Sequence, residues 1–325
     1  MMPKPLLIRA FFAALLVFSA PISAETPVLR VAVQETGTVN WEIDTIDHHG
    51  FDTANGFEMQ VQAMAGGPAS QVAFQGGEAD VIVSDWIWVA RQRAAGNDFV
   101  FLPYSKAVGG LMVRDDNPRE SLADFRNSKI GIAGGPLDKS WIILRAYAEK
   151  TFGMDLAKET EQVFGAPPLI FKAALDGEVD GAVNYWHFMA RMKAAGMVEL
   201  ISVADAAGAL GLDPETPLLG YVFKGDMLRD SPELIRAFAK ASRASKDLLA
   251  TDDAAWERLR PMMPANTEAE FEALKEGYRA GIPGTASVDL DSARAVFALM
   301  AKLGGRELVG TATEMPEGVF LDVGR

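Results

Sequence analysis

The chain has 325 residues, of which 49% are hydrophobic, with no cysteine and a formal net charge of −13. This length can bury the core of one large or two medium domains without disulfide bonds. The negative charge excludes nucleic acid and anionic membrane surfaces as partners, because both attract clusters of Lys and Arg.

Residues 1–24 are predicted to be an export signal. Lys4 and Arg9 give it a basic beginning, residues 10–20 are apolar, and small residues precede a cleavage site after Ala24. The apolar run is short for a membrane span of about 20 residues, although an uncleaved anchor is the alternative. Loss of the two basic residues changes the formal charge from −13 to −15. We expect the mature chain in the periplasm, without a lipid anchor, because no cysteine follows the signal.

Strands and helices are predicted to alternate along the mature chain. The first series has strands over 28–33, 57–63, 80–83 and 99–103, and helices over 41–49, 66–76 and 86–95. The second has a short helix over 121–125, strands over 129–133 and 197–203, and helices over 141–152 and 165–175. A strand over 218–223 returns to the first series, before helices over 231–250, from 267 onward and over 290–303. Such alternation predicts mostly parallel sheets with right-handed crossovers.

The sequence also repeats itself at a spacing of one hundred residues. Residues 77–86 (GEADVIVSDW) are echoed by residues 177–186 (GEVDGAVNYW), and the same offset pairs Trp41 with Trp141. A period this long excludes a solenoid, because the repeating units of solenoid proteins have about 20–50 residues. It predicts two similar α/β lobes with matching turns, and therefore a cleft that binds a ligand.

The predicted fold class is a two-lobed α/β fold, each lobe a mostly parallel sheet flanked by helices, with a helical C-terminal region. Lobe 1 takes residues 25–110, lobe 2 takes residues 111–216, and residues 217–325 supply a return strand to lobe 1 and the C-terminal helices. Two chain crossings, near 107–118 and 212–220, are expected to form a hinge.

Aromatic residues lie where predicted strands meet predicted helices, which is where α/β sheets bind ligands. They are Trp41, Trp86, Trp141, Tyr185 and Trp186. Such rings can hold a flat ring or a cationic nitrogen. The alternative, that they fill the core between helix and sheet, is favoured only for Trp88.

Polar residues occupy the same turns: Asn40, Ser70, Ser84, Asp85, Asp138, Ser140 and Asn184. Each could simply cap a helix, above all Ser70, Ser84 and Asn184. In a cleft, the two Asp residues favour a cationic ligand, whereas helix N-termini and Lys139 favour an anion. The charge of the ligand therefore stays open.

Patterns for catalysis are few. The only histidines are His48, His49 and His187, and their spacing forms no metal site. No phosphate-binding loop is present, and His187 has no partner nucleophile. We predict no catalytic residue, no metal and no cofactor.

Three segments resemble type II periplasmic solute-binding proteins: 121–132 (SLADFRNSKIGI), 174–182 (ALDGEVDGA) and 230–238 (DSPELIRAF). They are most similar to the group that binds nitrate, sulfonates, taurine and thiamine-pyrimidine precursors. The resemblance implies a monomeric two-lobed clamp that closes on a small solute and presents it to an ABC-type permease.

The ligand-facing turns that the resemblance implies are 36–41, 67–70, 84–86, 135–141 and 184–187, which add Thr38, Pro136 and His187 to the candidates. The expected ligand-binding set is Thr38, Asn40, Trp41, Ser70, Ser84, Asp85, Trp86, Pro136, Asp138, Ser140, Trp141, Asn184, Tyr185, Trp186 and His187. We expect a solute with a planar or cationic nitrogen portion.

Two alternatives stay open. One is an enzyme of the same fold that resembles thiamine-pyrimidine synthases, which consume a pyridoxal cofactor and a histidine; only His187 suggests it, and the export signal argues against it. The other is a periplasmic sensor subunit that serves a membrane receptor.

Overall fold

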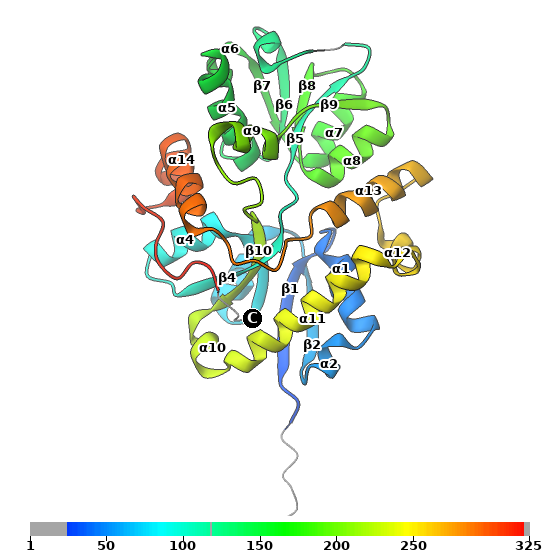
Figure 1. Cartoon of the computed structure of the whole chain (residues 1–325), viewed down its shortest axis with the longest axis vertical. Coiled ribbons are helices and arrows are strands. Elements are labelled where there is room, and N and C mark those ends of the chain that lie inside the picture. The colour runs from blue at the N-terminus through cyan, green and yellow to red at the C-terminus, as the bar shows by residue number, and fades with distance from the viewer. Residues whose placement is uncertain (1–24, 118, 322–325) are drawn as a thin grey trace, which may run out of the picture.

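Runs of apolar, often β-branched residues form two five-stranded sheets, which Figure 1 shows one above the other. The computed structural model describes residues 25–117 and 119–321, so the predicted signal over 1–24 lies outside the described residues. Among the described helices, none combines the length and the apolar character that a bilayer crossing requires.

The first sheet has the strand order β2-β1-β3-β10-β4. Its strands are β1 (Val28–Gln34), β2 (Glu58–Met64), β3 (Val81–Asp85), β4 (Phe99–Ser105) and β10 (Leu219–Lys224). Val31 pairs with Val61 on one side and with Val81 on the other, both in parallel. β10 alone runs antiparallel to its neighbours β3 and β4. The helices of this lobe are α1 (Val39–His48), α2 (Phe51–Ala54), α3 (Gly67–Gly76) and α4 (Trp86–Ala94).

The second sheet repeats this plan with the order β7-β6-β8-β5-β9. Its strands are β5 (Gly110–Arg114), β6 (Lys129–Ala133), β7 (Glu161–Gly165), β8 (Gly181–Asn184) and β9 (Met197–Ser202). β5 is its one reversed strand, antiparallel to β8 and β9. Its helices are η1 (Leu122–Phe125), α5 (Lys139–Phe152), α6 (Leu156–Glu159), α7 (Pro167–Leu175), α8 (Trp186–Ala194) and α9 (Val203–Leu210). The predicted fold class of two mostly parallel sheets flanked by helices is confirmed.

The sequence repeat corresponds to one structural unit used twice, β3–α4 in the first lobe and β8–α8 in the second. The Asp80 carboxylate accepts a hydrogen bond from the backbone N–H of Arg30, 3.0 Å away. The Asp180 carboxylate accepts one from the N–H of Lys129, 2.8 Å away. Each Asp thus ties the repeated strand, which is the central strand of its sheet, to the neighbouring parallel strand, β1 or β6. The repeat therefore preserves a strand connection as well as a hydrophobic pattern.

The chain passes between the lobes twice, over 106–109 and over 211–218. The first passage is shorter than the predicted crossing at 107–118, because β5 forms inside that range. β5 carries only three apolar residues in a row, Leu111 to Val113, which is a weak strand signal without its partners β8 and β9. Sequence analysis also missed β7 and α9.

The C-terminal part is helical: α10 (Gly225–Asp230), α11 (Pro232–Thr251), α12 (Asp253–Leu259), η2 (Arg260–Met262), α13 (Glu268–Ala280) and α14 (Leu290–Val309). α13 packs on α8 of the second lobe, and α14 packs on both α4 and α5. The predicted helix over 290–303 corresponds to the first part of α14, whose regular backbone is interrupted at Gly305. Gly305 adopts a positive φ of 60° and kinks the helix, which continues to Val309.

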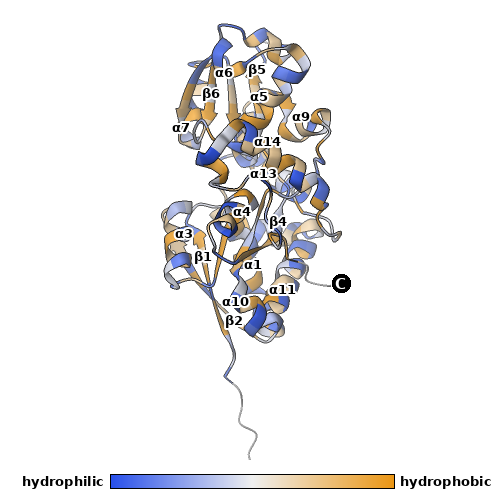
Figure 2. Cartoon of the chain, turned by 90° about the vertical axis from the view of Figure 1, so that its left-hand side faces the viewer, coloured by the Kyte–Doolittle hydropathy of each residue, from blue (hydrophilic) through white to orange (hydrophobic). Residues whose placement is uncertain are grey.

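The hydrophobic core runs between strands and helices in both lobes, and Figure 2 shows apolar strands with mixed helices around them. One buried cluster joins the lobes, since it includes Phe101 of β4, Ile132 of β6 and Phe297 of α14. α14 therefore belongs to the packing of both lobes.

Candidate functional site

The two sheets direct the turns after their parallel strands toward one another, and an ion pair joins two of these turns. Lys139, the first residue of α5 in the second lobe, donates to Asp85 Oδ2 of the first lobe, with an Nζ–Oδ2 distance of 2.9 Å. The side chains are only 24% and 16% exposed. Burial opposes the charge of Lys139, but the carboxylates of Asp85 and Asp138 outweigh it and raise its pKa. Lys139 is therefore a half-buried cation at the junction of the lobes.

A cavity of about 390 Å³ adjoins this ion pair on the side of the second lobe. It is lined by residues 134–139, by Tyr185 and by Glu307 of α14. Asp138 caps α5, since its Oδ1 accepts from the Trp141 N–H at 3.0 Å. Burial raises the pKa of Asp138, and burial together with the Asp138 charge raises that of Tyr185. A small solute in this cavity would meet a carboxyl, a phenol and an ammonium group.

Gly134 keeps this cavity open. Its φ of +90° lies in the left-handed region, and a Cβ there would come within 3.3 Å of the Tyr185 hydroxyl. A side chain at 134 would be both strained and inserted between the polar groups of the cavity.

Of the predicted site residues, the structure brings Pro136, Asp138 and Tyr185 to the cavity, and Lys139 connects Asp85 to them. Lys139 was noted in the sequence only as a possible anion partner, and Glu307 was not predicted at all. No local signal marks Glu307, because α14 reaches the site from the far end of the chain.

None of the four predicted tryptophans, Trp41, Trp86, Trp141 and Trp186, lines this cavity. Trp86 is fully buried, with its ring 5.3 Å from that of Phe320 and 6.5 Å from that of Phe297. Trp141 is 2% exposed and belongs to the same buried cluster. The expectation that these two rings line the cleft is corrected, because both are buried in a cluster that includes Phe297 of α14.

Trp41 is buried too, in an aromatic group at the lobe junction. Its ring lies 6.1 Å from Trp186 of α8, 5.7 Å from Trp256 of α12 and 5.9 Å from Tyr278 of α13. The rings of Trp41 and Trp186, from different lobes, thus contact each other where the sequence predicted a ligand between them.

Several predicted polar residues make local bonds instead of helix caps. Ser70 bonds to the Gly66 carbonyl, and Asn184 donates to the Pro167 carbonyl at 3.0 Å. The remaining ones lie at the ends of helices or strands: Asn40 of α1 donates to the carbonyls of Gln34 and Glu35, Ser84 of β3 accepts from Gln71, and Ser140 of α5 is buried. Thr38 precedes α1 without a side-chain cap. The cap of α4 is Asp85, whose Oδ1 accepts from the Trp88 N–H at 2.9 Å, so the predicted cap at Ser84 is wrong.

His187 is a half-buried histidine whose Nδ1 has no hydrogen-bond partner in the part of the chain that the structure describes. Burial and the nearby Arg191 charge lower its pKa to about 4. The imidazole is therefore neutral at pH 7 and a weak base.

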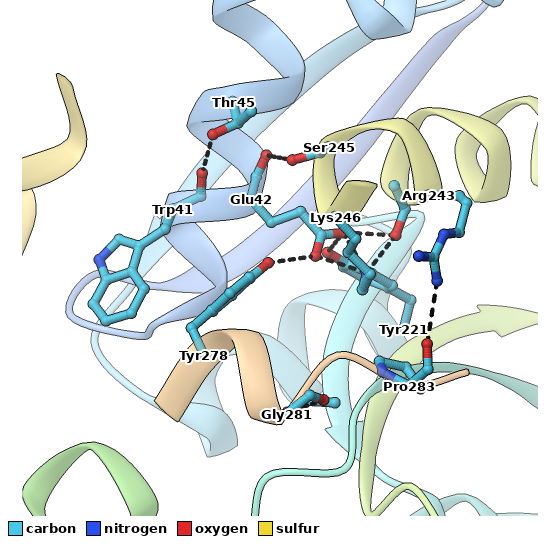
Figure 3. Close-up of polar contacts among 12 residues, drawn as sticks. Trp41, Glu42, Thr45, Tyr221, Arg243, Ser245, Lys246, Tyr278, Gly281 and Pro283 are labelled. Atoms are coloured by element: carbon cyan, nitrogen blue, oxygen red, sulfur yellow. Dashed lines mark hydrogen bonds and ion pairs between the residues drawn. The ribbon is translucent and has the colours of Figure 1, made fainter. Parts of the chain in front are cut away.

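A buried polar cluster supports the first lobe beneath α1, as Figure 3 shows. Glu42, with no exposed surface, forms an ion pair of 2.7 Å with Lys246 of α11. Its carboxylate also accepts from the hydroxyls of Tyr221, Ser242 and Tyr278 at 2.8, 2.6 and 3.1 Å. These donors come from β10, α11 and α13, so one carboxylate holds four elements together. The sequence did not predict this cluster.

A second cavity, of about 380 Å³, lies between α8, α13 and the first chain crossing. Most of its lining is apolar, and an ion pair between Lys193 and Glu199 lies at it. Across the described residues, 25–117 and 119–321, no group of three His, Cys, Asp or Glu side chains could hold a metal.

Comparison with known proteins places this geometry in a family. The model of the NMT1/THI5-like family matches residues 45–255. No curated protein matches the chain.

Solved structures share the architecture at low sequence identity. The periplasmic aliphatic sulphonate-binding protein SsuA of Escherichia coli has a TM-score of 0.71 and 17% identity, over 91% of this chain and 94% of its own. The alkanesulfonate-binding protein SsuA of Xanthomonas axonopodis pv. citri, bound to MOPS, has a TM-score of 0.68 and 14% identity, over 92% and 99%. A Candida albicans protein described as having the generic periplasmic binding protein fold has a TM-score of 0.58 and 14% identity, over 86% and 90%. The chain therefore has the periplasmic-binding-protein fold.

Proposed function

Because the chain belongs to the NMT1/THI5-like family, we propose that it is the periplasmic solute-binding component of an ABC-type importer. It captures a small organic solute where its two lobes meet and delivers it to a permease in the inner membrane. We also propose that the chain is exported and monomeric. Recovering it from the periplasm would test export, and its mass in solution would test whether it is a monomer.

The observation that carries the proposal is the contact between Lys139 and Asp85, 2.9 Å apart and from different lobes, beside a cavity of about 390 Å³. Cavities that bind small ligands have about 300–1,000 Å³ and a few converging polar groups. Asp138, Lys139 and Tyr185 are such groups, and they follow the strands β6 and β8.

The mechanism follows from the two crossings over 106–109 and 211–218. A solute that contacts both lobes binds the closed arrangement better than an open one, and therefore shifts the hinge equilibrium toward closure. The ion pair of Asp85 and Lys139 joins the two lobes beside the cavity, so a solute bound there lies next to charged groups from both lobes. The closed form is what the permease would recognise.

The enzyme alternative rests on His187 alone. With its pKa lowered to about 4, its imidazole is a poor general base at neutral pH, because a base works best with a pKa near the working pH. Absorbance of the purified chain after incubation with pyridoxal phosphate tests this alternative. A sensor role is separated from import by asking whether the chain co-purifies with a permease.

A thermal-shift screen of the mature chain against amines, betaines, pyrimidines, sulfonates and nitrate tests the proposal. A ligand at 100 times its Kd stabilises the fold by about 2.7 kcal/mol, which moves Tm by several degrees. Asp85→Ala should weaken binding of the hit by more than about tenfold, or roughly 1.4 kcal/mol. Lys150→Gln, on the same helix as Lys139 but bonded to the Ala209 carbonyl, is the control. Normal binding by Asp85→Ala would place the site elsewhere.

A further inference from the structure

The charges at the cavity point to the class of solute, an inference that rests on the proposed function. We infer that the solute is an organic cation with N–H donors, an ammonium or a guanidinium, and that Asp138 and Tyr185 recognise it.

The first step is the charge of the lining. The cavity has two carboxylate residues, Asp138 and Glu307, and one basic residue, Lys139. The Lys139 ammonium is already paired with Asp85, so its charge is neutralised from the other lobe. The lining is therefore negative, and it attracts a cation and repels an anion.

The second step concerns the helix N-termini, which hold anions in many proteins through their unpaired N–H groups. In α4 and α5 these groups already have an anion. Asp85 accepts from the Trp88 N–H at 2.9 Å, and Asp138 accepts from the Trp141 N–H at 3.0 Å. A sulfonate at either helix would have to displace, or lie beside, a carboxylate.

The third step concerns the two oxygen atoms that border the cavity, Asp138 Oδ2 and the Tyr185 hydroxyl. A point one Cβ length from Gly134 lies 3.8 Å from Asp138 Oδ2 and 3.3 Å from the Tyr185 hydroxyl. Both oxygens therefore border the same space, which Gly134 leaves unfilled. Within the described residues, the Tyr185 hydroxyl has no hydrogen-bond partner, and its side chain is 38% exposed. An N–H donor placed there reaches a carboxylate and a phenol, and the Tyr185 ring offers a face to the positive charge.

The pKa of Asp138 is consistent with a positively charged solute. Burial raises its pKa although the Trp141 N–H and the Lys139 charge act in the opposite direction, so these groups compensate its ionised form only in part. A bound cation supplies further compensation. The inference separates this chain from the solved structures named as sulfonate-binding proteins, which it resembles in fold.

The experiment compares probes that differ in charge but not in carbon skeleton: n-butylammonium against butane-1-sulfonate, with larger amines, guanidines and aminopyrimidines beside their sulfonate or carboxylate analogues. Binding to the mature chain is measured by calorimetry and thermal shift. The variants are Asp138→Asn, which keeps a capping side chain, and Lys139→Gln, with Lys150→Gln as control. The unliganded Tm of each variant checks that it folds.

The two variants should act in opposite directions. A cation should bind, Asp138→Asn should weaken it at least tenfold, and Lys139→Gln should leave its affinity equal or higher because Asp85 loses its partner. Binding of anions alone, abolished by Lys139→Gln and kept by Asp138→Asn, would overturn the inference while leaving the proposed solute-binding function intact. Absence of binding by every cation and every anion would count against both.

Discussion

The indole ring of Trp186 lies directly against the backbone of Gly277, where an added Cβ would come within 2.9 Å of two ring carbons. Trp186 begins α8 of the second lobe. Gly277 belongs to α13, whose neighbouring Tyr278 donates its hydroxyl to Glu42 of the first lobe at 3.1 Å. Arg191 and Glu270 add an ion pair of 3.2 Å between the same two helices. α13 therefore connects the buried polar cluster of one lobe to the other lobe.

Gly277→Ala should destabilise the chain, because the new methyl group must push α13 away from Trp186. Overpacking of this kind costs about 1–3 kcal/mol, which should exceed the gain of up to about 1 kcal/mol from replacing Gly by Ala in a helix. Urea unfolding, followed by tryptophan fluorescence, measures the difference.

Gly208→Ala is the matched control, since Gly208 lies in α9 and a Cβ there meets nothing within 4 Å. It should gain about 0.5–1 kcal/mol from helix propensity. Equal gains in both variants would show that Trp186 and α13 are not in tight contact.

The pair of Glu42 and Lys246 gives a second prediction. Lys246→Met removes the cation that forms an ion pair with Glu42, a carboxylate that has no exposed surface. Breaking a buried ion pair costs about 3–5 kcal/mol, and the three hydroxyl donors to Glu42 should hold the loss near the lower value. Adding Glu42→Gln should recover part of it, because no charge is then left buried. A double variant less stable than Lys246→Met in chemical unfolding would contradict this account of the cluster.

His187 predicts a pH dependence. Its pKa is lowered to about 4 in the folded chain, against about 6.5 in an unfolded one. Between these values the unfolded state binds the proton more tightly, so stability falls as pH falls from about 6.5 to about 4, by roughly 3 kcal/mol. His187→Gln should lose this part of the acid sensitivity, measured as the free energy of unfolding at both ends of the range. The exposed His48→Gln is the control, and an unchanged pH dependence in His187→Gln would refute the burial argument.

Much of the architecture is readable from the sequence because its signals are local. The repeat at residues 77–86 and 177–186 predicts the two lobes, and the structure explains it through Asp80 and Asp180, which bond to the starts of equivalent strands. Apolar runs mark most of the strands, and glycines mark the ends of most of the helices. Both signals place the boundaries within a few residues. β5 was not predicted because its three consecutive apolar residues lie beside a chain crossing. Without the partner strands β8 and β9, such a short run is indistinguishable from a loop.

The candidate site was less predictable because distant segments decide which side chains stay accessible. Trp86 and Trp141 occupy positions equivalent to ligand-facing turns, yet both are buried in a cluster that includes Phe297 of α14, more than a hundred residues further along the chain. Conversely, Lys139 gains its importance from Asp85, 54 residues earlier in the chain. Composition shows that both charges exist, but only the fold places them 2.9 Å apart.

The central claim, that a solute binds where the lobes meet, is tested most directly by the distance between the lobes. The chain has no cysteine, so nitroxide labels can be attached at Val72→Cys of α3 and Leu169→Cys of α7, which are 69% and 58% exposed. Pulsed electron-spin resonance would then measure the distance with and without a periplasmic small-molecule extract. The account predicts that the extract narrows the distance distribution to one closed population, and that Asp85→Ala abolishes the effect. A distribution unchanged by the extract, with bound solute detected by mass spectrometry, would contradict closure of the lobes on the solute.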